Sequence, residues 1–291
     1  ETDIPIFHLS TSMCPAHRHD ILEKIRKRLN KNKKCICVST QLIEAGVDIS
    51  FQCVIRSLAG LDSIAQAAGR CNRHGKLGIQ KVYVIDHEEE KLDNLIEIQI
   101  GKEISKRIFI DLKKDPNSHD GNILSRKAME KYFKEFYMKM ESNLNYFIPN
   151  LRIDMTDLLS APKRTYRYHC AYERKYNKKL ELFIVNSYKT AAEHFQVIDS
   201  KTTPIIVPYG KGKEIIAELN GYRTTEDITK VIKKAQRYTI NVYKYGIEKL
   251  AKNQGLASFM DGRILALKEG AYDENYGLDL EQESSLDLLC F

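Results

Sequence analysis

Short apolar runs alternate with helical patterns along the first 110 residues of the chain. The apolar runs predict strands at residues 6–9, 35–38, 53–55 and 81–86, and the two middle runs are of the buried type. Helices are predicted at residues 20–29, where the apolar positions share one face, and at residues 62–68. This alternation indicates an α/β fold with a parallel sheet and crossover helices.

The middle of the chain has a different pattern. Residues 125–141 place Met and aromatic side chains at helical spacing, which predicts an amphipathic helix whose apolar stripe belongs to a core. Residues 113–124 are loop-like and could form a boundary.

A second, smaller α/β unit is predicted from about residue 185. Helices are expected at residues 186–195, 213–219 and 225–236, and strands at residues 196–199, 204–207, 238–243 and 263–267. Asp261-Gly262 is a turn signal before the last of these strands. The pattern therefore divides the chain into residues 1–115, a helical linker at 116–184, and a C-terminal α/β domain at 185–291.

Composition places the chain among ordinary globular proteins, with 291 residues, 43% hydrophobic and 29% charged residues. No stretch approaches the roughly 18 consecutive apolar residues of a membrane span, so no membrane association is expected. The N-terminal residues lack the pattern of a signal peptide and resemble the middle of a fold, so we expect the chain to begin inside a longer parent. The seven cysteines are scattered without C-x-x-C, which fits a reducing cytoplasm and predicts neither a disulfide framework nor a zinc site.

The net charge of +7 is unevenly distributed. The segment 269–291 holds seven acidic residues and no Lys or Arg, so all 46 basic residues lie before it. A basic body of this kind is suited to a polyanion, although a lysine-rich host composition would produce the same balance. The acidic segment also carries many apolar residues, so we expect residues 272–291 to pack on the C-terminal domain rather than to form a solvated tail.

A first chemical motif, S-T-Q-L-I-E-A-G-V-D-I-S, follows the strand predicted at residues 35–38. Ligands of open α/β sheets bind at the carboxyl ends of strands. Ser39 and Thr40 offer hydroxyls and N–H groups to phosphate oxygens, Gly46 permits a close backbone approach, and Asp48 could grip a ribose hydroxyl. Taken alone the motif is weak, because many strand–helix loops contain such residues.

A second motif, Q-x-x-G-R-x-x-R, is formed by Gln66, Gly69, Arg70 and Arg73. On a helix, two arginines three residues apart project from the same side and could share an anion such as a triphosphate. The alternative is a solvated basic helix face.

The two motifs in this order resemble motifs V and VI of superfamily 2 helicases, whose second RecA-like domain would then be residues 1–115. The resemblance implies that Arg70 and Arg73 meet the γ-phosphate of ATP and that Gln66 holds the site together, with Arg73 as the arginine finger. It also implies a nucleotide-binding role for Gly46, Asp48 and Gly69. The same resemblance places DNA contacts on Ser39, Thr40, Gln41 and Arg18.

A longer stretch around both motifs is similar to the CRISPR-associated type I helicase–nucleases, namely STQLIEAGVDISF…VIR…LDSIAQAAGRCNRHG. Later segments are most like subtype I-C, among them HFQVIDSKTTPIIVPYGKG and GAYDENYGLDL. The resemblance implies single-stranded DNA and the Cascade complex as partners. It also implies ATP and Mg²⁺ in the intact parent, an HD nuclease domain and a first RecA-like domain upstream. The chain has no phosphate loop and no D-E-x-H motif, so we expect it to hydrolyse no ATP alone, to bind no nucleotide tightly and to hold no metal.

Other candidate sites are weaker. His8, His17 and His19 are close in sequence but do not form a plausible ligand set, and His19-Asp20 lacks the partners of an HD nuclease. Tyrosines interleaved with basic residues at 164–176 could stack on bases or simply pack on a helix. Two alternative functions remain: a repair or restriction helicase, and a non-catalytic module that docks on Cascade or on an anti-CRISPR inhibitor.

Overall fold

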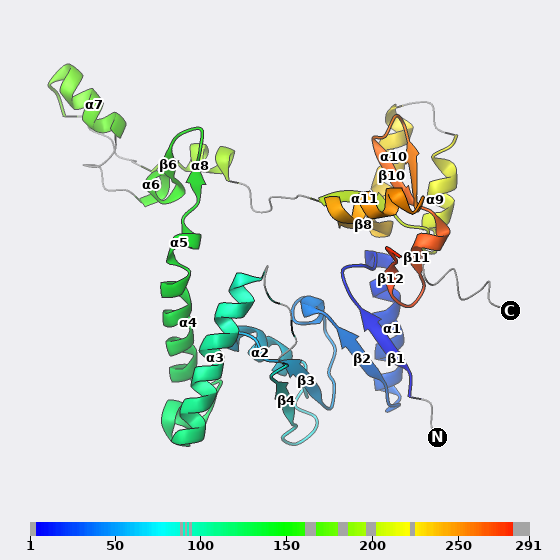
Figure 1. Ribbon diagram of the computed structural model, residues 1–291, viewed down its shortest axis with the longest axis horizontal. Coiled ribbons are helices and arrows are strands. Elements are labelled where there is room, and N and C mark those ends of the chain that lie inside the picture. Colours follow the sequence, from blue (N-terminus) through cyan, green and yellow to red (C-terminus); the bar gives the residue numbers. More distant parts are fainter. Residues whose placement is uncertain are drawn as a thin grey trace. The chain divides into compact units, whose positions relative to one another are not determined.

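The computed structural model describes residues 4–87, 90, 92, 95–160, 167–179, 186–195, 202–221 and 225–281, without the side chains of residues 167–168 and 225–227. The chain forms two compact units. The first unit comprises Glu1–Arg56, Ala65–Tyr83 and Ser200–Phe291, and the second comprises Ser57–Ile64 and Val84–Asp199. Figure 1 shows both units coloured along the sequence. The first unit thus contains both the N-terminal and the C-terminal part of the chain. Their wide separation in sequence did not indicate this.

The first unit opens with a strand–helix–strand element. Strand β1 (Ile6–Leu9) pairs in parallel with β2 (Ile36–Ser39), with Ile6 opposite Ile36 and Leu9 opposite Ser39. Helix α1 (Pro15–Asn30) connects them, and its proline stands in the first turn, where no backbone N–H is needed. The core beneath this element consists of Leu9, Met13, Ile21, Ile25, Val47 and Ile49.

The predicted strands exist, but the description of β2 as a buried-type strand was wrong. Its side chains alternate: Cys37 packs towards the α1 core, whereas Ile36 and Val38 are 48% and 53% exposed. Burial raises the pKa of the Cys37 thiol to about 12, so this cysteine has little thiolate character at neutral pH. One face of the β1–β2 pair is therefore covered and the other is bare.

A second strand pair follows. Strand β3 (Val54–Ser57) lies beside β4 (Val82–Ile85), and helix α2 (Leu61–Ala68) lies between them in sequence. In the described part of the chain these strands form a separate two-stranded sheet, because the hydrogen bonds of β2 go to β1. The sequence predicted one continuous parallel sheet, whereas the described residues show a parallel pair, β1–β2, and a separate pair, β3–β4.

The C-terminal part of the first unit is built on a four-stranded sheet in the order β8-β7-β10-β9. The strands are β7 (Thr202–Ile206), β8 (Thr239–Tyr243), β9 (Leu256–Phe259) and β10 (Ile264–Leu267). β7 runs parallel to β10 and antiparallel to β8, and β9 and β10 form an antiparallel hairpin. The predicted turn lies in this hairpin, with Asp261 and Gly262 at positive φ.

Three helices accompany this sheet: α9 (Gly212–Glu218), α10 (Thr225–Ala235) and α11 (Lys244–Lys252). Two apolar cores are formed by the sheet and its helices, one including Ile205, Val207 and Leu250 and the other including Ile206, Ile215 and Val231. The predicted strands and helices from residue 202 onwards are thus present with ends shifted by a few residues. The strand predicted at residues 196–199 lies outside the described residues.

The C-terminal sheet docks on helix α1 within the first unit. Tyr272 begins β11 (Tyr272–Asp273), and its hydroxyl accepts the backbone N–H of Cys14 and lies 2.9 Å from Nδ1 of His17. The imidazole of His17 stacks on Tyr209 at 4.2 Å between ring centroids. Burial lowers the pKa of His17, so the ring is held in the neutral form, which can accept the tyrosine proton.

The acidic C-terminal segment contributes to this docking as far as residue 281. Strand β12 (Gly277–Leu278) pairs with β11, and the N–H of Leu278 donates to the carbonyl of Ser12 at 2.9 Å. Leu278 and Leu280 pack against the core of the sheet, and Glu281 pairs with Lys249. The predicted packing is therefore observed for this stretch, and residues 282–291 lie outside the described residues.

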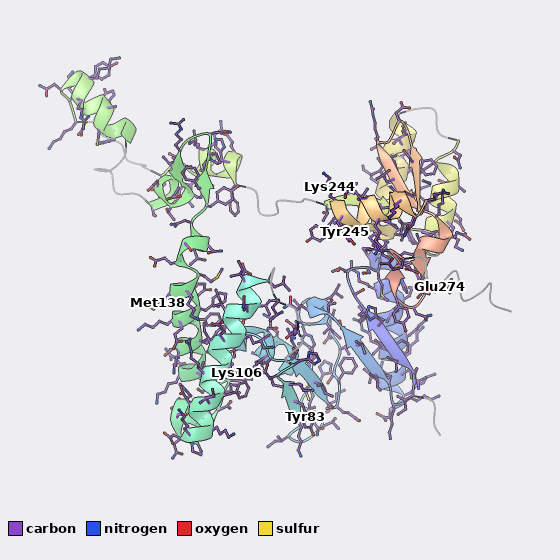
Figure 2. All side chains as sticks on the ribbon, viewed as in Figure 1. Tyr83, Lys106, Met138, Lys244, Tyr245 and Glu274 are labelled. Carbon is purple, nitrogen blue, oxygen red and sulfur yellow. The ribbon has the colours of Figure 1, made fainter. Side chains whose placement is uncertain are left out.

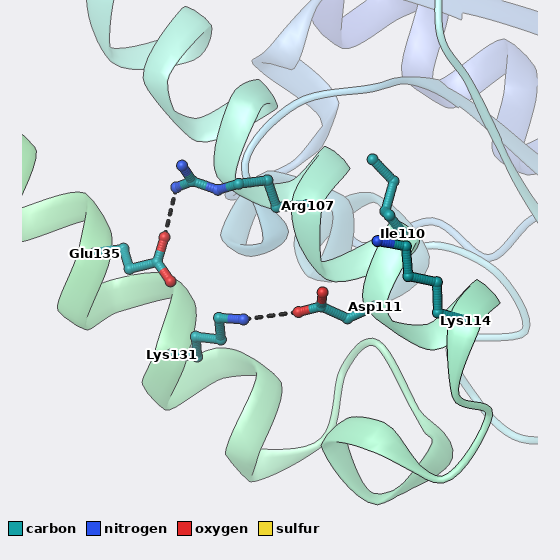
Figure 3. Close-up of a pocket in the computed structure, with 6 residues that line it drawn as sticks. All are labelled: Arg107, Ile110, Asp111, Lys114, Lys131 and Glu135. Carbon is teal, nitrogen blue, oxygen red and sulfur yellow. Dashed lines mark hydrogen bonds and ion pairs between the residues drawn. The ribbon is translucent and has the colours of Figure 1, made fainter.

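The second unit is centred on two helices, α3 (Ile96–Lys114) and α4 (Arg126–Lys139). Their shared core consists of Leu58, Leu61, Ile64, Ile104, Ile108, Ala128 and Tyr132. The hydroxyl of Tyr132 donates to Asp62 at 2.7 Å, and the aromatic stripe of α4 is core, as predicted, except for Tyr137, which is 51% exposed. Figure 3 shows the open pocket between the two helices, where Arg107 pairs with Glu135 and Lys131 pairs with Asp111.

The rest of the second unit consists of short elements, namely α5 (Glu141–Leu144), β5 (Phe147–Ile148), β6 (Ile153–Asp154), α6 (Met155–Ser160), α7 (Arg167–Tyr176) and α8 (Tyr188–His194). On α7, Tyr172 and Tyr176 are partly exposed with ring centroids 4.7 Å apart, and base stacking there stays a prediction. Arg164 and Tyr166 lie outside the described residues. None of the described helices is long and apolar enough to cross a membrane.

Candidate nucleotide site

The candidate site begins where β2 ends. The N–H of Thr40 donates to the carbonyl of Leu9 at 3.1 Å, which extends the β1–β2 pairing by one bond. The hydroxyl of Ser39 donates to the carbonyl of Thr40 at 2.9 Å, and a 3₁₀ turn follows at Gln41–Ile43. Thr40 and Gln41 are exposed and Ser39 is half-buried. The sheet thus holds this segment while leaving its polar groups accessible.

The loop after the turn is anchored by alternating side chains. Val47 and Ile49 are buried in the α1 core, and Asp48 between them is directed to solvent with 68% of its side chain exposed. Gly46 precedes them at a φ of +72°, a backbone conformation that favours glycine, and a Cβ at this position would meet nothing within 4 Å. The two buried residues therefore present the Asp48 carboxylate and leave open space at Gly46.

Arg70 holds this loop in place through hydrogen bonds to two of its backbone carbonyls. Its guanidinium donates from Nε to the carbonyl of Ile43 at 2.8 Å and from Nη2 to the carbonyl of Glu44 at 2.6 Å. The residue is 8% exposed, so both bonds are shielded from water. The planar fork of arginine suits two neighbouring acceptors, and in this structure those acceptors are peptide carbonyls.

The expectation that Arg70 and Arg73 project side by side from a helix was wrong. Helix α2 ends at Ala68, so neither arginine lies on it. A turn at Gly69 directs Arg70 inward, and the backbone of the next residues pairs with Phe51, which accepts from Asn72 and donates to Arg70 at 2.8 Å each. Asn72 has a positive φ of 46°, which turns the chain again before Arg73. The two arginines therefore have different surroundings.

Arg73 faces solvent beside Asp48. Its Nε donates to Oδ1 of Asp48 at 2.9 Å, and Nε2 of His74 lies 3.9 Å from the same oxygen. The side chains of Arg73 and Asp48 are 39% and 68% exposed. An ion pair this exposed contributes about 0–1 kcal/mol, so its opening costs little. Arg73 is thus a cation that a stronger anion could recruit.

Three further residues, Glu44, Arg56 and His74, complete the site without having been predicted. Glu44 is buried, and its carboxylate lies 2.9 Å from Nε of Arg56 on β3. Arg56 therefore binds the side chain of Glu44, and Arg70 binds the backbone carbonyl of the same residue. The sequence does contain a signal for Glu44. It is an acidic residue among apolar and small residues, and a carboxylate that becomes buried with such a loop needs a charged or hydrogen-bonding partner.

The remaining predicted residues take less part in these contacts. Gln66 is exposed on α2, and Arg18 is half-buried in the first half of α1. Gly69 has its carbonyl 3.5 Å from Nη1 of Arg73. The structure thus brings together Asp48, Gly69, Arg70 and Arg73 around one loop.

Metal chemistry is not indicated by the described side chains. Within the described ranges, no group of three His, Cys, Asp or Glu residues could hold a metal ion. His17 is engaged with Tyr272, and Asp20 accepts the hydroxyl of Tyr209 at 3.0 Å. These contacts give both residues structural roles in docking the C-terminal sheet.

The segment that holds this site is similar to known proteins. Residues 1–76, which include both motifs up to Lys76, match the family model described as CRISPR-associated nuclease/helicase Cas3, C-terminal. A CRISPR-associated nuclease/helicase Cas3 from Haloferax volcanii is 43% identical over 77 residues, which are 26% of this chain and 8% of that protein. The Cas3 of Streptococcus thermophilus is 34% identical over 76 residues, 24% of this chain and 8% of that protein. The matched region is thus a small part of each relative.

The fold is similar to a solved structure of a Cas3 protein. The crystal structure of T. fusca Cas3 aligns with 91% of this chain and 33% of its own length, with a TM-score of 0.50 and 12% sequence identity. At that identity the likeness concerns the fold alone, a mixed α/β architecture with small sheets. Residues 1–76 of the chain are thus similar to the C-terminal region of CRISPR-associated nuclease/helicase Cas3 proteins.

Proposed function

We propose that the chain supplies one side of the ATP site of a Cas3-type DNA helicase, through motifs V and VI of a RecA-like lobe. The observation that carries this proposal is the exposed Asp48–Arg73 pair on a loop that Arg70 clamps by two backbone carbonyls. A rigid loop with one weakly held arginine is suited to a group that must reach a phosphate when nucleotide arrives.

Each residue has a distinct part in this proposal. Arg73 leaves Asp48 and donates to the γ-phosphate, where it stabilises the charge of the transition state by about 10³–10⁵ in rate. Asp48, freed from Arg73, accepts a ribose hydroxyl, and the open space at Gly46 admits the nucleotide close to the backbone. Arg70 acts as a positioning residue, because its guanidinium is used by the carbonyls of the loop.

The residues present fit half of an ATP site. The described part of the chain offers donors for phosphate oxygens, but its sequence contains no phosphate loop to cradle the β- and γ-phosphates and no D-E-x-H acid for Mg²⁺. Those groups would come from a first RecA-like domain of the complete enzyme. When bound, Mg²⁺ would neutralise developing charge on the phosphates, while this chain would orient Arg73.

Single-stranded DNA and Cascade are the proposed partners of the complete enzyme. The exposed Thr40 and Gln41 at the end of β2 offer donors to a phosphodiester backbone. A chain with 46 basic and 39 acidic residues, whose last 23 residues hold seven acids and no Lys or Arg, has a basic body that suits a polyanion. The proposed subtype, I-C, rests on the resemblance of the later segments HFQVIDSKTTPIIVPYGKG and GAYDENYGLDL.

Reconstitution tests the proposal. The purified chain should show no DNA-stimulated ATP hydrolysis, and adding the remaining Cas3-type polypeptide of the same genome should produce it. Turnover by the chain alone would show that its ATP site is complete. Absence of turnover from the mixture, when the same two parts joined in one polypeptide are also inactive, would contradict the proposal.

A non-catalytic docking module is the second candidate function. It is favoured by the apolar side chains that remain on the surface of β1 and β2. Binding of an anti-CRISPR protein or of Cascade by the isolated chain, with no effect of Arg73→Ala on interference, would favour it over the ATP-site proposal.

A further inference from the structure

Helix α7 carries a pair of exposed tyrosines that the proposed ATP site does not use. Tyr172 and Tyr176 are 37% and 52% exposed, and their ring centroids lie 4.7 Å apart with 44° between the ring planes. The ammonium of Lys175 lies 5.2 Å from the centroid of the Tyr176 ring. Residues three and four positions apart share one face of a helix, so the two rings and this cation form a single surface. We call these three residues the tyrosine face.

The surroundings of the tyrosine face are basic. Residues 167–179 contain five Lys or Arg residues and one acid, Glu173. The carboxylate of Glu173 lies 3.7 Å from Nδ1 of His169, whose side chain is 11% exposed, so the acid belongs to a more covered side of the helix. Four basic residues are exposed and have no acidic partner among the described residues, namely Arg174, Lys175, Lys178 and Lys179. Such a cluster of cations attracts a polyanion.

Another exposed lysine and tyrosine lie side by side in the sequence at the start of α11. Lys244 and Tyr245, which Figure 2 labels, are both exposed. The ammonium of Lys244 lies 3.9 Å from the carboxylate of Glu248, one helical turn further along, so this cation already has an acid beside it. Helix α7 differs because it combines two rings in contact with cations that lack an acidic partner in the described part of the chain.

We propose that the tyrosine face stacks on unpaired bases of single-stranded DNA while Lys178 and Lys179 contact the phosphates beside them. Every base has a π face that stacks on an aromatic ring, and basic residues next to such rings follow the backbone of the strand. A duplex keeps its base faces within its own stack, so the rings favour a single strand. The choice of DNA rests on the proposed function, whereas the preference for unpaired bases comes from α7. The contact lies outside both sequence motifs.

The rings distinguish a nucleic acid from an acidic protein segment. The positive charge of α7 suits either partner, but carboxylates have no π face to place on a tyrosine. Loss of one stacked base by alanine substitution weakens binding about 5- to 100-fold. Phenylalanine in place of tyrosine keeps the ring and should therefore keep the affinity. The comparison of alanine with phenylalanine at Tyr172 and Tyr176 thus isolates the contribution of stacking.

The test measures binding of the purified full chain to a fluorescein-labelled oligothymidylate by fluorescence anisotropy, without ATP. The variants are Tyr176→Ala, Tyr172→Ala/Tyr176→Ala and Tyr172→Phe/Tyr176→Phe. The matched control is Tyr188→Ala, because Tyr188 is a tyrosine on α8 that is 61% exposed. A DNA duplex of the same length tests the preference for unpaired bases. Oligouridylate and polyglutamate test RNA and an acidic protein segment as occupants.

The expected result is about 5- to 100-fold weaker oligothymidylate binding by Tyr176→Ala and a larger loss in the double alanine variant. Tyr188→Ala and the double phenylalanine variant should bind like wild type, and the duplex should bind more weakly than the single strand. Lys178→Ala/Lys179→Ala should reduce the slope of log K against log salt concentration by about 1.4, because each phosphate contact on a single strand contributes about 0.7. Because the substituted side chains are exposed, every variant should unfold at the wild-type urea concentration.

Wild-type affinity of the double alanine variant would overturn the proposal, and so would an equal loss of affinity in Tyr176→Ala and Tyr188→Ala. Equal affinity for duplex and single strand would contradict it too, since α7 would then act through charge alone. Tighter binding of oligouridylate or of polyglutamate than of oligothymidylate would assign the face to RNA or to an acidic protein segment. These measurements involve no hydrolysis, so they are separable from the test of the proposed function. Base stacking on α7 in a complete enzyme that hydrolyses no ATP supports the tyrosine face and contradicts the ATP site.

Discussion

Replacing Arg70 with alanine is the perturbation for which the structure gives the clearest magnitude. The guanidinium makes two charge-assisted hydrogen bonds to carbonyls, at 2.8 Å and 2.6 Å, and is 8% exposed. A hydrogen bond to a charged group contributes about 1.5–3 kcal/mol, so the loss of both predicts a decrease of about 3 kcal/mol or more in the free energy of unfolding. Arg73→Ala removes an exposed ion pair and should cost at most about 1 kcal/mol.

Urea denaturation of the wild type, Arg70→Ala and Arg73→Ala measures this difference. Arg70→Lys should fall between wild type and alanine, because an ammonium cannot reproduce the two diverging bonds of the planar fork. Limited proteolysis at residues 41–50 should increase in Arg70→Ala and stay at the wild-type level in Arg73→Ala. The reasoning fails if the two alanine variants are equally stable, because Arg70 would then not clamp the loop.

Three further predictions concern the rest of the fold. Because burial lowers the pKa of His17, the unfolded chain binds a proton more tightly than the folded chain. The free energy of unfolding should therefore fall by up to about 1.4 kcal/mol per pH unit as the pH drops below about 6.5. His17→Gln should reduce this slope, measured by urea denaturation at pH 7.5 and 5.5. Tyr132→Phe removes the bond to Asp62 and should lower the free energy of unfolding by about 2 kcal/mol, again measured in urea. Deleting residues 279–291 removes the packing of Leu280 and should lower the free energy of unfolding by about 1–2 kcal/mol. The complete enzyme should keep its DNA-stimulated ATPase. An unchanged unfolding midpoint would show that the segment is dispensable for folding.

Local patterns predicted most of the elements. Residues 6–9 were predicted as a strand and form β1, and the helices predicted at residues 125–141, 213–219 and 225–236 are present as α4, α9 and α10. The 19-residue helix α3 was missed. Its apolar positions are mostly isoleucine, which favours strands locally, and the spacing of Ile100, Ile104 and Ile108 identifies the helix once the core is known.

The candidate site was predictable in its residues but not in its geometry. The spacing of Arg70 and Arg73 could not reveal that α2 ends at Ala68, after which a turn directs one arginine inward and the other outward. The different surroundings of the two arginines depend on the carbonyls of Ile43 and Glu44, which lie more than 25 residues before Arg70 in the sequence. Such a contact has no local signature.

Long-range docking was also beyond sequence reasoning. His17 and Tyr272 are 255 residues apart, and nothing in either local pattern pairs them. The linear division at residues 115 and 184 stays a prediction, whereas the compact units join the first 56 residues with the C-terminal sheet.

The most direct test of the central claim is the DNA-stimulated ATPase of the complete enzyme carrying Arg73→Ala. Arg126→Ala is the matched control, because Arg126 is a solvent-exposed arginine on α4 that pairs with Glu130. The account predicts that Arg73→Ala lowers kcat by about 10³-fold or more while the unfolding midpoint stays at the wild-type value, and that Arg126→Ala has wild-type turnover. Wild-type turnover by the stably folded Arg73→Ala enzyme would contradict the account.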